Sequence, residues 1–284
     1  MKRSLILAII LSATFTGIHA QLLWKISGNG LKKTSYLFGS HHLIPVAFLD
    51  SVPGLYKAFN ESDIIVSEVI ARNIETSDYM RKAAVIPDKK TMKDLIPDSS
   101  YKALDAELKS VLKIGLKELS VLNPGLIYNL YETELFKKLT GVYDDAQSDS
   151  YFQIAAAEKD KKVVGLENID QNLKLLFDPS NIQQQANKLV NTAIHKDSLT
   201  RELLMFNKLY KAGKINDLTL LWQRTENSDE INHNAKRHAE WMNQLPALIK
   251  ENSCFITLEL QHLIGDDGII TNLQKAGYKV KPME

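Results

Sequence analysis

The sequence predicts an α+β protein with a mixed central sheet, built from strands near both ends of the chain, and a large helical insertion between them. Strand-like apolar segments cluster at the two ends, whereas the middle carries apolar residues at helical spacing. No low-complexity linker or clean boundary divides the 284 residues. We therefore expect one domain over residues 21–284, with a helical region at about 99–250.

The first elements follow from turn signals and β-branched runs. Residues 22–27 are predicted to form a strand, and a Gly-Asn-Gly turn signal leads into a returning strand at 34–38. Residues 53–60 are a short helix candidate. Residues 63–69 are predicted to form a buried strand, because their core is a continuous β-branched run.

The remaining elements are mostly helical until the chain nears its end. Residues 161–167 interrupt the helices as a short strand, and 253–261 and 278–280 are the last strand candidates. The predicted helices of this part are 99–114, 123–139, 151–159, 180–212, 216–223, 230–250 and 268–275. The strands therefore come from segments that lie far apart in the chain.

Composition excludes some classes of protein. The chain is 44% hydrophobic and 24% charged, with a formal net charge of +1. This is ordinary globular composition, and it lacks the basic footprint of a nucleic-acid-binding protein. Cys254 is the single cysteine, so no intramolecular disulfide can form, and we expect it to act as a small buried hydrophobe.

The first twenty residues have the pattern of a secretory signal peptide. Lys2 and Arg3 precede an apolar run, and Ala20 offers a cleavage site before Gln21. The run is short for a bilayer span, and no later segment is apolar enough for one. We therefore predict an exported protein, periplasmic or secreted, with no integral span after signal removal. A retained N-terminal anchor helix is the alternative.

Ionisable residues follow four of the predicted apolar strands. They are His42, Glu68, Glu167 and His262. Ligand sites in sheet proteins lie beyond the carboxyl ends of strands. Two imidazoles and two carboxylates are a plausible first shell for a divalent metal, whose bound water would become a nucleophile near neutral pH.

Each of these residues also has a structural interpretation. A glutamate after a buried strand often caps a helix or pairs with a lysine, and His41 or His42 can be a satisfied structural histidine. Four ionisable groups at strand ends are harder to explain by packing alone. Gly39 supports a site, because a glycine there suits a close backbone approach or a positive φ. Familiar catalytic signatures such as His-Glu-x-x-His and the Walker loop are absent.

The order and spacing of several short segments resemble the TraB/PrgY/GumN family, which includes the Tiki proteins of animals. The matching segments span nearly the whole mature chain, at 23–26, 36–42, 66–68, 163–167, 237–241, 262–268 and 277–280. The resemblance implies a fold related to erythromycin esterases and haem-binding ChaN-like proteins. It also implies a metal-dependent protease that uses manganese or cobalt.

By this resemblance, His42 and His262 are metal-ligand candidates, and Glu68 and Glu167 are ligand or base candidates. Arg237 matches the arginine of an Arg-Asn-x-x-Trp motif and is expected to polarise a carbonyl or clamp a carboxylate. Asp149 resembles a family aspartate more weakly, and Trp241 is expected in the core.

Two residues depart from the family pattern. The second Gly-x-x-His motif has Glu259 in place of glycine, and His238 replaces the expected asparagine. Glu259 would either crowd the site or point to the other face of the strand.

Two functions remain open from the sequence. The first is an exported metal-dependent hydrolase acting on a peptide or protein substrate. There His42 and His262 hold the ion, Glu68 or Glu167 takes the proton, and Arg237 stabilises the oxyanion. The second is a non-catalytic binding protein on the same scaffold, which sequesters a peptide, haem or metal.

Overall fold

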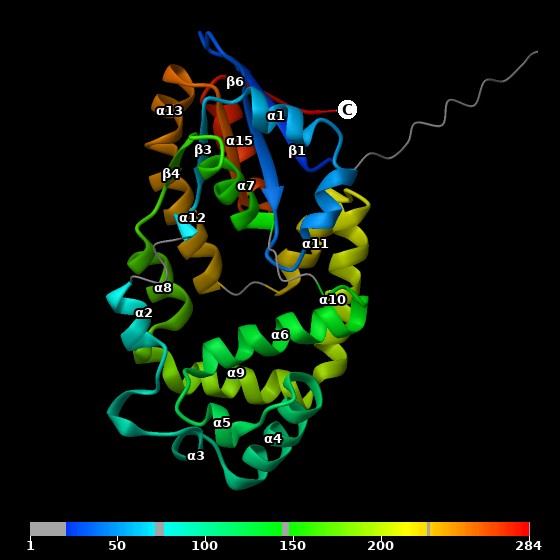
Figure 1. Ribbon diagram of the computed structural model, residues 1–284, viewed down its shortest axis with the longest axis vertical. Coiled ribbons are helices and arrows are strands. Elements are labelled where there is room, and N and C mark those ends of the chain that lie inside the picture. The colour runs from blue at the N-terminus through cyan, green and yellow to red at the C-terminus, as the bar shows by residue number, and fades with distance from the viewer. Residues whose placement is uncertain (1–20, 72–76, 144–147, 226–227, 284) are drawn as a thin grey trace, which may run out of the picture.

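The computed structural model describes residues 21–71, 77–143, 148–225 and 228–283. It contains one six-stranded sheet with the strand order β4-β3-β5-β2-β1-β6. The sheet lies in one half of the molecule, the upper half in Figure 1. The strands are β1 (Leu23–Gly28), β2 (Ser35–Ser40), β3 (Ile64–Ser67), β4 (Lys162–Gly165), β5 (Cys254–Glu259) and β6 (Tyr278–Pro282). All six predicted strands are present, and the α+β class with a mixed sheet is confirmed.

Strand direction determines where the site candidates lie. β1 pairs antiparallel with β2 and β6, whereas β4, β3, β5 and β2 are successive parallel neighbours. The carboxyl ends of these four strands therefore share one edge of the sheet. They are the same four strands after which the sequence places ionisable residues.

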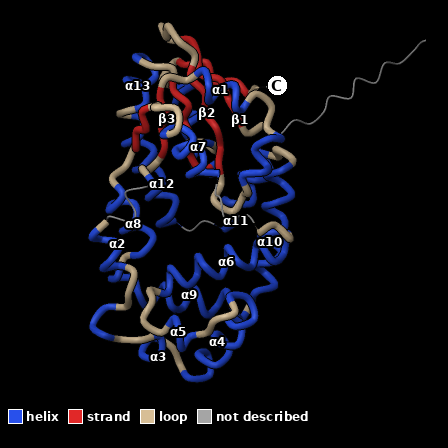
Figure 2. Tube along the Cα trace, in the orientation of Figure 1, coloured by secondary structure: helices blue, strands red, loops and turns tan. Residues whose placement is uncertain are grey.

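Helices cover the sheet and form the other half of the molecule (Figure 2). α1 (Leu55–Glu61) packs on β2, and α7 (Ser148–Ala157) packs on β3, β4 and β5. Away from the sheet, α4 (Asp98–Leu112), α6 (Pro124–Thr140), α9 (Ile182–Ile194) and α10 (Lys196–Lys211) pack on one another. The others are α2 (Asp78–Ala83), α3 (Met92–Leu95), α5 (Leu116–Leu119), α8 (Ile169–Phe177), α11 (Ile215–Thr225), α12 (Ser228–Met242), α13 (Leu245–Glu251), α14 (Leu260–Leu263) and α15 (Ile269–Lys275).

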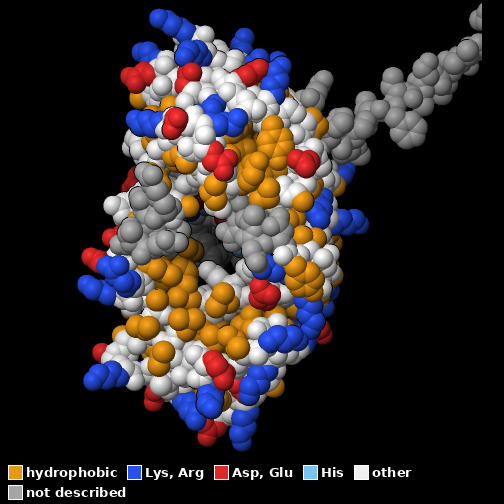
Figure 3. Space-filling view, in the orientation of Figure 1, with side chains coloured by type: hydrophobic (Ala, Val, Ile, Leu, Met, Phe, Trp, Pro, Cys, Tyr) orange, Lys and Arg blue, Asp and Glu red, His pale blue; other side chains and the backbone are white. Residues whose placement is uncertain are grey.

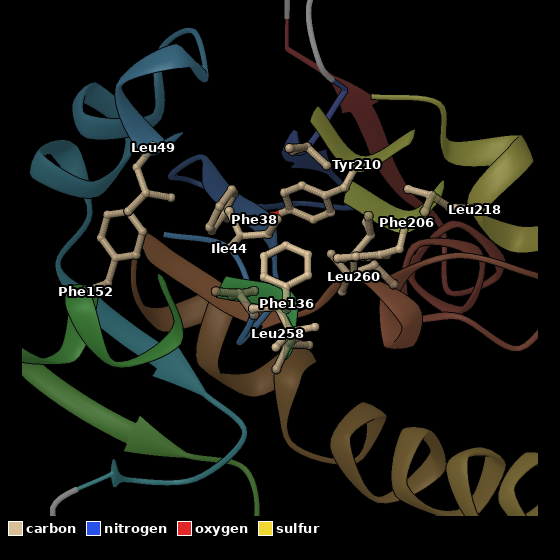
Figure 4. Packing of buried hydrophobic residues seen from close by; sticks show 14 of the residues in the cluster. Phe38, Ile44, Leu49, Phe136, Phe152, Phe206, Tyr210, Leu218, Leu258 and Leu260 are labelled. Atoms are coloured by element: carbon tan, nitrogen blue, oxygen red, sulfur yellow. The ribbon is translucent and has the colours of Figure 1, made fainter. Parts of the chain in front are cut away.

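Aromatic packing joins the sheet to α7. The Phe152 ring lies with its centroid 4.7 Å from that of Phe255 on β5 and 5.8 Å from that of Phe38 on β2. Figure 4 shows Phe38 and Phe152 among the buried residues of this core. Every residue of β2 is buried, which fits a strand covered on both faces.

Gly39 allows a close approach rather than an unusual backbone angle. A Cβ at this position would lie 2.5 Å from Leu260 Cδ1 and 3.2 Å from Leu260 Cβ. Its carbonyl accepts a hydrogen bond from the buried Tyr210 hydroxyl of α10 at 2.6 Å. The predicted close backbone approach is therefore real, and it fixes the end of β2 against α14 and α10.

Three predicted elements differ from the structure. The helix predicted at 180–212 breaks at His195, whose φ of −104° and ψ of 38° are not helical. The helix predicted at 230–250 divides before α13, where a proline stands in the first turn. The last long strand ends at Glu259, so His262 lies on the short helix α14 and not at a strand tip.

None of the helices in the described ranges is long and apolar enough to cross a membrane. The predicted signal peptide at 1–20 and the side chain of Asp149 lie outside what the structure describes.

Candidate functional site

The shared edge of the parallel strands carries four ionisable residues in spatial order. Glu167 follows β4, Glu68 follows β3, Glu259 ends β5, and His42 lies just beyond β2. His262 is three residues further along the chain from Glu259, within α14. The residues that follow the four parallel strands therefore lie along one edge of the sheet, as their positions after the strands predict.

Arg237 of α12 contacts three of the predicted residues. Its Nε donates a hydrogen bond to Glu167 Oε1 at 2.7 Å, and its Nη2 donates to Glu68 Oε2 at 2.8 Å. Its Nη1 lies 2.9 Å from His262 Nε2. The side chains of Arg237 and Glu167 are 12% and 6% exposed, so these charges are largely withdrawn from water. We call these four residues the Arg237 cluster.

The charge states in the Arg237 cluster follow from its burial and its pairing. Burial alone would lower the pKa of Arg237, but the hydrogen bond to Glu167 and the negative charge of Glu68 outweigh it and raise the pKa. Burial lowers the pKa of His262 well below its ordinary value, and the Arg237 charge lowers it further. The cluster therefore holds a charged guanidinium beside a neutral imidazole.

A chain of hydrogen bonds fixes the tautomers of His262 and His238. Arginine only donates, so His262 Nε2 is the acceptor for Arg237, and His262 Nδ1 carries the proton. That proton points to His238 Nε2 at 3.1 Å. His238 Nδ1 in turn donates to the Asp267 carbonyl at 2.8 Å. His238, a departure from the family motif, thus orients the His262 ring through the nitrogen that does not face Arg237.

Trp241 belongs to the core and also contacts the Arg237 cluster. It is fully buried, and its Nε1 donates to Glu167 Oε1 at 2.8 Å. Its ring centroid lies 4.8 Å from Arg237 Cζ, which is cation–π distance. Arg237 and Trp241 are four positions apart on one helix and therefore share a face. That spacing is the sequence signal for this contact.

Glu259 holds His42. Glu259 Oε1 lies 2.9 Å from His42 Nδ1, and Oε2 accepts from Gln261 Nε2 at 3.1 Å. The Glu259 backbone N–H donates to Glu68 Oε1 at 2.9 Å, which links this pair to the Arg237 cluster. We call His42 and Glu259 the His42–Glu259 dyad. The glutamate that departs from the family motif therefore contacts a predicted site residue, on the side of the sheet edge that bears His42.

The electrostatics of the dyad favour an ionised carboxylate. Burial by itself would raise the pKa of Glu259, but the hydrogen bond from His42 and the electrostatic attraction of His42 hold that pKa well below its usual range. A carboxylate bound to one ring nitrogen fixes the orientation of the imidazole. His42 Nε2 lies 4.0 Å from Glu132 Oε2 of α6.

His41 fits the structural interpretation of a histidine. Burial, followed by the charge of His42, lowers the pKa of His41 to about 3. Its Nδ1 accepts a hydrogen bond from the Leu43 backbone N–H at 3.2 Å, and its ring centroid lies 4.1 Å from that of Phe206. His41 is therefore a neutral packing residue beside the dyad.

A cavity of about 120 Å³ opens beside the dyad. Its lining combines histidine, carboxylate, aliphatic and aromatic side chains: His41, His42, Leu43, Glu132, Glu202, Leu203, Phe206, Leu221 and Trp222. In Figure 3 the molecular surface is hollowed between the sheet half and the helical half, with hydrophobic side chains above and below the hollow. Sequence reasoning did not single out Glu132, Glu202 or Trp222, because nothing in the pattern of α6, α10 and α11 marks them as facing one cavity.

A divalent ion shared by His42 and His262 does not fit this arrangement. His262 Nε2 accepts from the Arg237 guanidinium, and His42 Nδ1 faces Glu259. A cation next to the guanidinium would be repelled, so the ion could enter only if Arg237 left its partners. In the parts of the chain that are described, no group of three or more His, Cys, Asp or Glu side chains is arranged to hold a metal.

Comparisons with known proteins identify the family. Neither the curated proteins nor the solved structures contain a match to the chain. A family model described as the TraB/PrgY/gumN family matches residues 22–282, which is nearly all of the chain. That span includes all six strands of the sheet, α12 and every candidate site residue described above. The chain therefore belongs to the TraB/PrgY/gumN family.

Proposed function

We propose that this protein is an exported hydrolase that cleaves carbonyl compounds, with peptides as the first substrates to test. The observation that carries the proposal is the 2.9 Å contact between His42 Nδ1 and Glu259 Oε1, together with the cavity that His42 lines. A carboxylate that orients an imidazole beside a cavity is an arrangement that supports general-base catalysis.

In this proposal His42 is the base. Its Nε2 takes a proton from a water molecule as that water attacks the carbonyl carbon. Glu259 accepts the Nδ1 proton in a hydrogen bond and stabilises the imidazolium that forms. The proton then passes from Nε2 to the leaving group, which returns His42 to its neutral form.

The Arg237 cluster has a supporting role in the proposal, instead of the predicted oxyanion contact. Arg237 is engaged by Glu167 and His262, and it holds Glu68 through Oε2. Glu68 Oε1 in turn accepts from the Glu259 backbone N–H. The cluster thereby positions the residue that positions His42. Glu68 and Glu167 stay candidate bases, and their variants separate this role from that of His42.

Manganese and cobalt remain the cofactors to test, because the family resemblance implies them. The chain's own residues bind and orient the substrate and move the proton in the proposal, so metal dependence is a separate measurement. Metal analysis of the purified mature protein, and cleavage with added Mn²⁺, added Co²⁺ or EDTA, test this prediction directly.

The test of the function is peptide cleavage by purified residues 21–284. Loss of a general base lowers rates by about 10²- to 10⁴-fold, so His42→Ala should reduce kcat/KM by that factor. Glu259→Gln should cause a smaller loss, because the imidazole remains. Glu134→Gln is the control, since this glutamate lies on α6 and pairs with Lys137 instead of His42. Absence of cleavage in every metal condition would refute the proposal.

A binding protein without catalysis is the second candidate. The observation that favours it is that Arg237 hydrogen-bonds both Glu167 and His262. These predicted site residues are therefore bound to another residue of the chain. The cavity would then serve only to hold a peptide or another small ligand. This candidate predicts ligand binding by the wild-type protein with no turnover under any metal condition.

A further inference from the structure

The cavity beside the His42–Glu259 dyad is lined by two carboxylates on different helices. Glu132 of α6 and Glu202 of α10 both line it. Within the described residues, neither forms an ion pair with a lysine or an arginine. Glu132 accepts a hydrogen bond from the Tyr128 hydroxyl at 3.2 Å and lies 4.0 Å from His42 Nε2.

The nearest basic residues have closer partners than these two carboxylates. His42 is 2.9 Å from Glu259, which is a closer partner than Glu132. Lys188 of α9 attracts Glu202 electrostatically, but its Nζ lies over the Tyr128 ring at 4.8 Å from the centroid. Burial, followed by the charge of Glu132, raises the pKa of Glu202. The cavity therefore has an excess of negative charge that a cation would relieve.

The other walls suit an apolar stem and a cationic tip. Leu203 and Leu221 are aliphatic, and Phe206 and Trp222 are aromatic with ring centroids 6.3 Å apart. Aromatic faces attract ammonium and guanidinium groups, and aliphatic walls bury methylene groups. A lysine or arginine side chain combines these two parts. An acidic ligand would meet the two glutamates, and a wholly apolar one would leave them without a counter-charge.

We propose that this cavity binds the basic side chain of a peptide substrate, with Glu132 and Glu202 as its counter-charges and Phe206 and Trp222 as its walls. That the bound peptide is a substrate rests on the proposed function, but binding of a basic side chain in the cavity does not require catalysis. It makes the hydrolase selective for a lysine or arginine next to the bond that is cleaved.

Binding is measured first, without turnover. The chain has three tryptophans, and Trp222 lines the cavity, so its fluorescence reports on occupancy. The probes are Nα-acetyl-lysine amide, which has only the side-chain amine, norleucine amide, which has only the α-amine, and neutral Nα-acetyl-norleucine amide. The signal is assigned by its loss in Trp222→Phe. We expect saturable binding of the acetyl-lysine probe, and no binding of the neutral probe.

The variants identify the counter-charge. Glu202→Gln keeps the shape of the side chain and removes its charge, and it should weaken binding of the acetyl-lysine probe about tenfold. Glu134→Gln should leave binding unchanged. Equal binding of the charged and neutral probes, or no effect of Glu202→Gln in a protein with a wild-type circular dichroism spectrum, would overturn the proposal. Preference for norleucine amide would also overturn it, because the cavity would then take a peptide N-terminus.

Cleavage distinguishes failure of this inference from failure of the proposed function. If the protein hydrolyses peptides, kcat/KM should be at least tenfold higher for a lysine peptide than for its norleucine analogue, and Glu202→Gln should remove the difference. Cleavage of both peptides at the same rate retains the function and rejects the basic pocket. Binding of acetyl-lysine amide by a protein that cleaves nothing retains the pocket and rejects the hydrolase.

Discussion

Replacing Arg237 with methionine should destabilise the protein strongly, because it removes the guanidinium from two nearly buried carboxylates. Methionine retains much of the length of the side chain and its apolar contact with Trp241. The Glu68 and Glu167 side chains are only 16% and 6% exposed in their ion pairs with Arg237. Without the guanidinium they would face each other and His262 with no counter-charge.

The size of the effect follows from burial. Breaking a buried ion pair by removing one partner costs about 3–5 kcal/mol, whereas an exposed pair contributes about 0–1 kcal/mol. We therefore expect Arg237→Met to lower the free energy of unfolding by about 3–5 kcal/mol. At about 2 °C per kcal/mol for a chain of this size, Tm should fall by about 6–10 °C.

Urea denaturation followed by circular dichroism measures the change. Arg81→Met is the matched control, because Arg81 pairs with Asp78 on the exposed surface of α2, and its loss should cost less than about 1 kcal/mol. The Arg237→Met defect should shrink as pH falls. The uncompensated carboxyls would have pKa values above those of the unfolded chain, so the folded variant binds protons preferentially and gains stability in acid. A loss below about 1 kcal/mol, or a defect independent of pH, would refute the buried-pair interpretation.

Three further outcomes are expected. Glu259→Gln should reduce stability at neutral pH but not in strong acid. The pKa of Glu259 is lowered in the fold, so its pair with His42 stabilises the fold above the pKa of an unfolded glutamate, about 4.3, and this stabilisation is lost as pH falls toward the lowered value. Denaturation measured across pH that shows the same loss of stability at every pH would contradict this. Gly39→Ala should cost about 1–3 kcal/mol, since its Cβ would lie 2.5 Å from Leu260 Cδ1, and Leu260→Ala in the same chain should make the added methyl group less costly; additive losses in a double-mutant cycle would argue against the clash. Tyr210→Phe should cost about 1–3 kcal/mol by leaving the buried Gly39 carbonyl without its 2.6 Å donor, and a neutral result in thermal denaturation would show that this hydrogen bond contributes little.

The sheet could be predicted because its strands carry strong local signals. β3 and β5 are continuous apolar runs, and ionisable residues follow them directly. The rule that parallel strands share a carboxyl edge then predicts that Glu68 and Glu167 lie close together. Arg237 was assigned by its spacing to Trp241 within the family motif. These predictions depend on sequence neighbours or on one general rule of topology.

The partners of these residues could not be predicted, because they depend on tertiary packing. Arg237 contacts residues 70 and 169 positions away in the chain, and no local pattern specifies which carboxylate a helix will meet. From the sequence alone, the Glu259 side chain could face either side of β5 and could crowd the site. Its pairing with His42 becomes visible only when the register of β5 beside β2 is known.

The pairing of β2 with β5 has a consequence for how the protein folds. Ser35 and Cys254, whose hydrogen bond joins the two strands, are 219 positions apart in the sequence. Closing so long a loop costs conformational entropy before any contact offsets it, and folds dominated by such contacts form slowly. His42 meets Glu259 only after this closure. A folding chain would therefore acquire its dyad late, and a fragment that ends before β5 would never have it, however well its helices form.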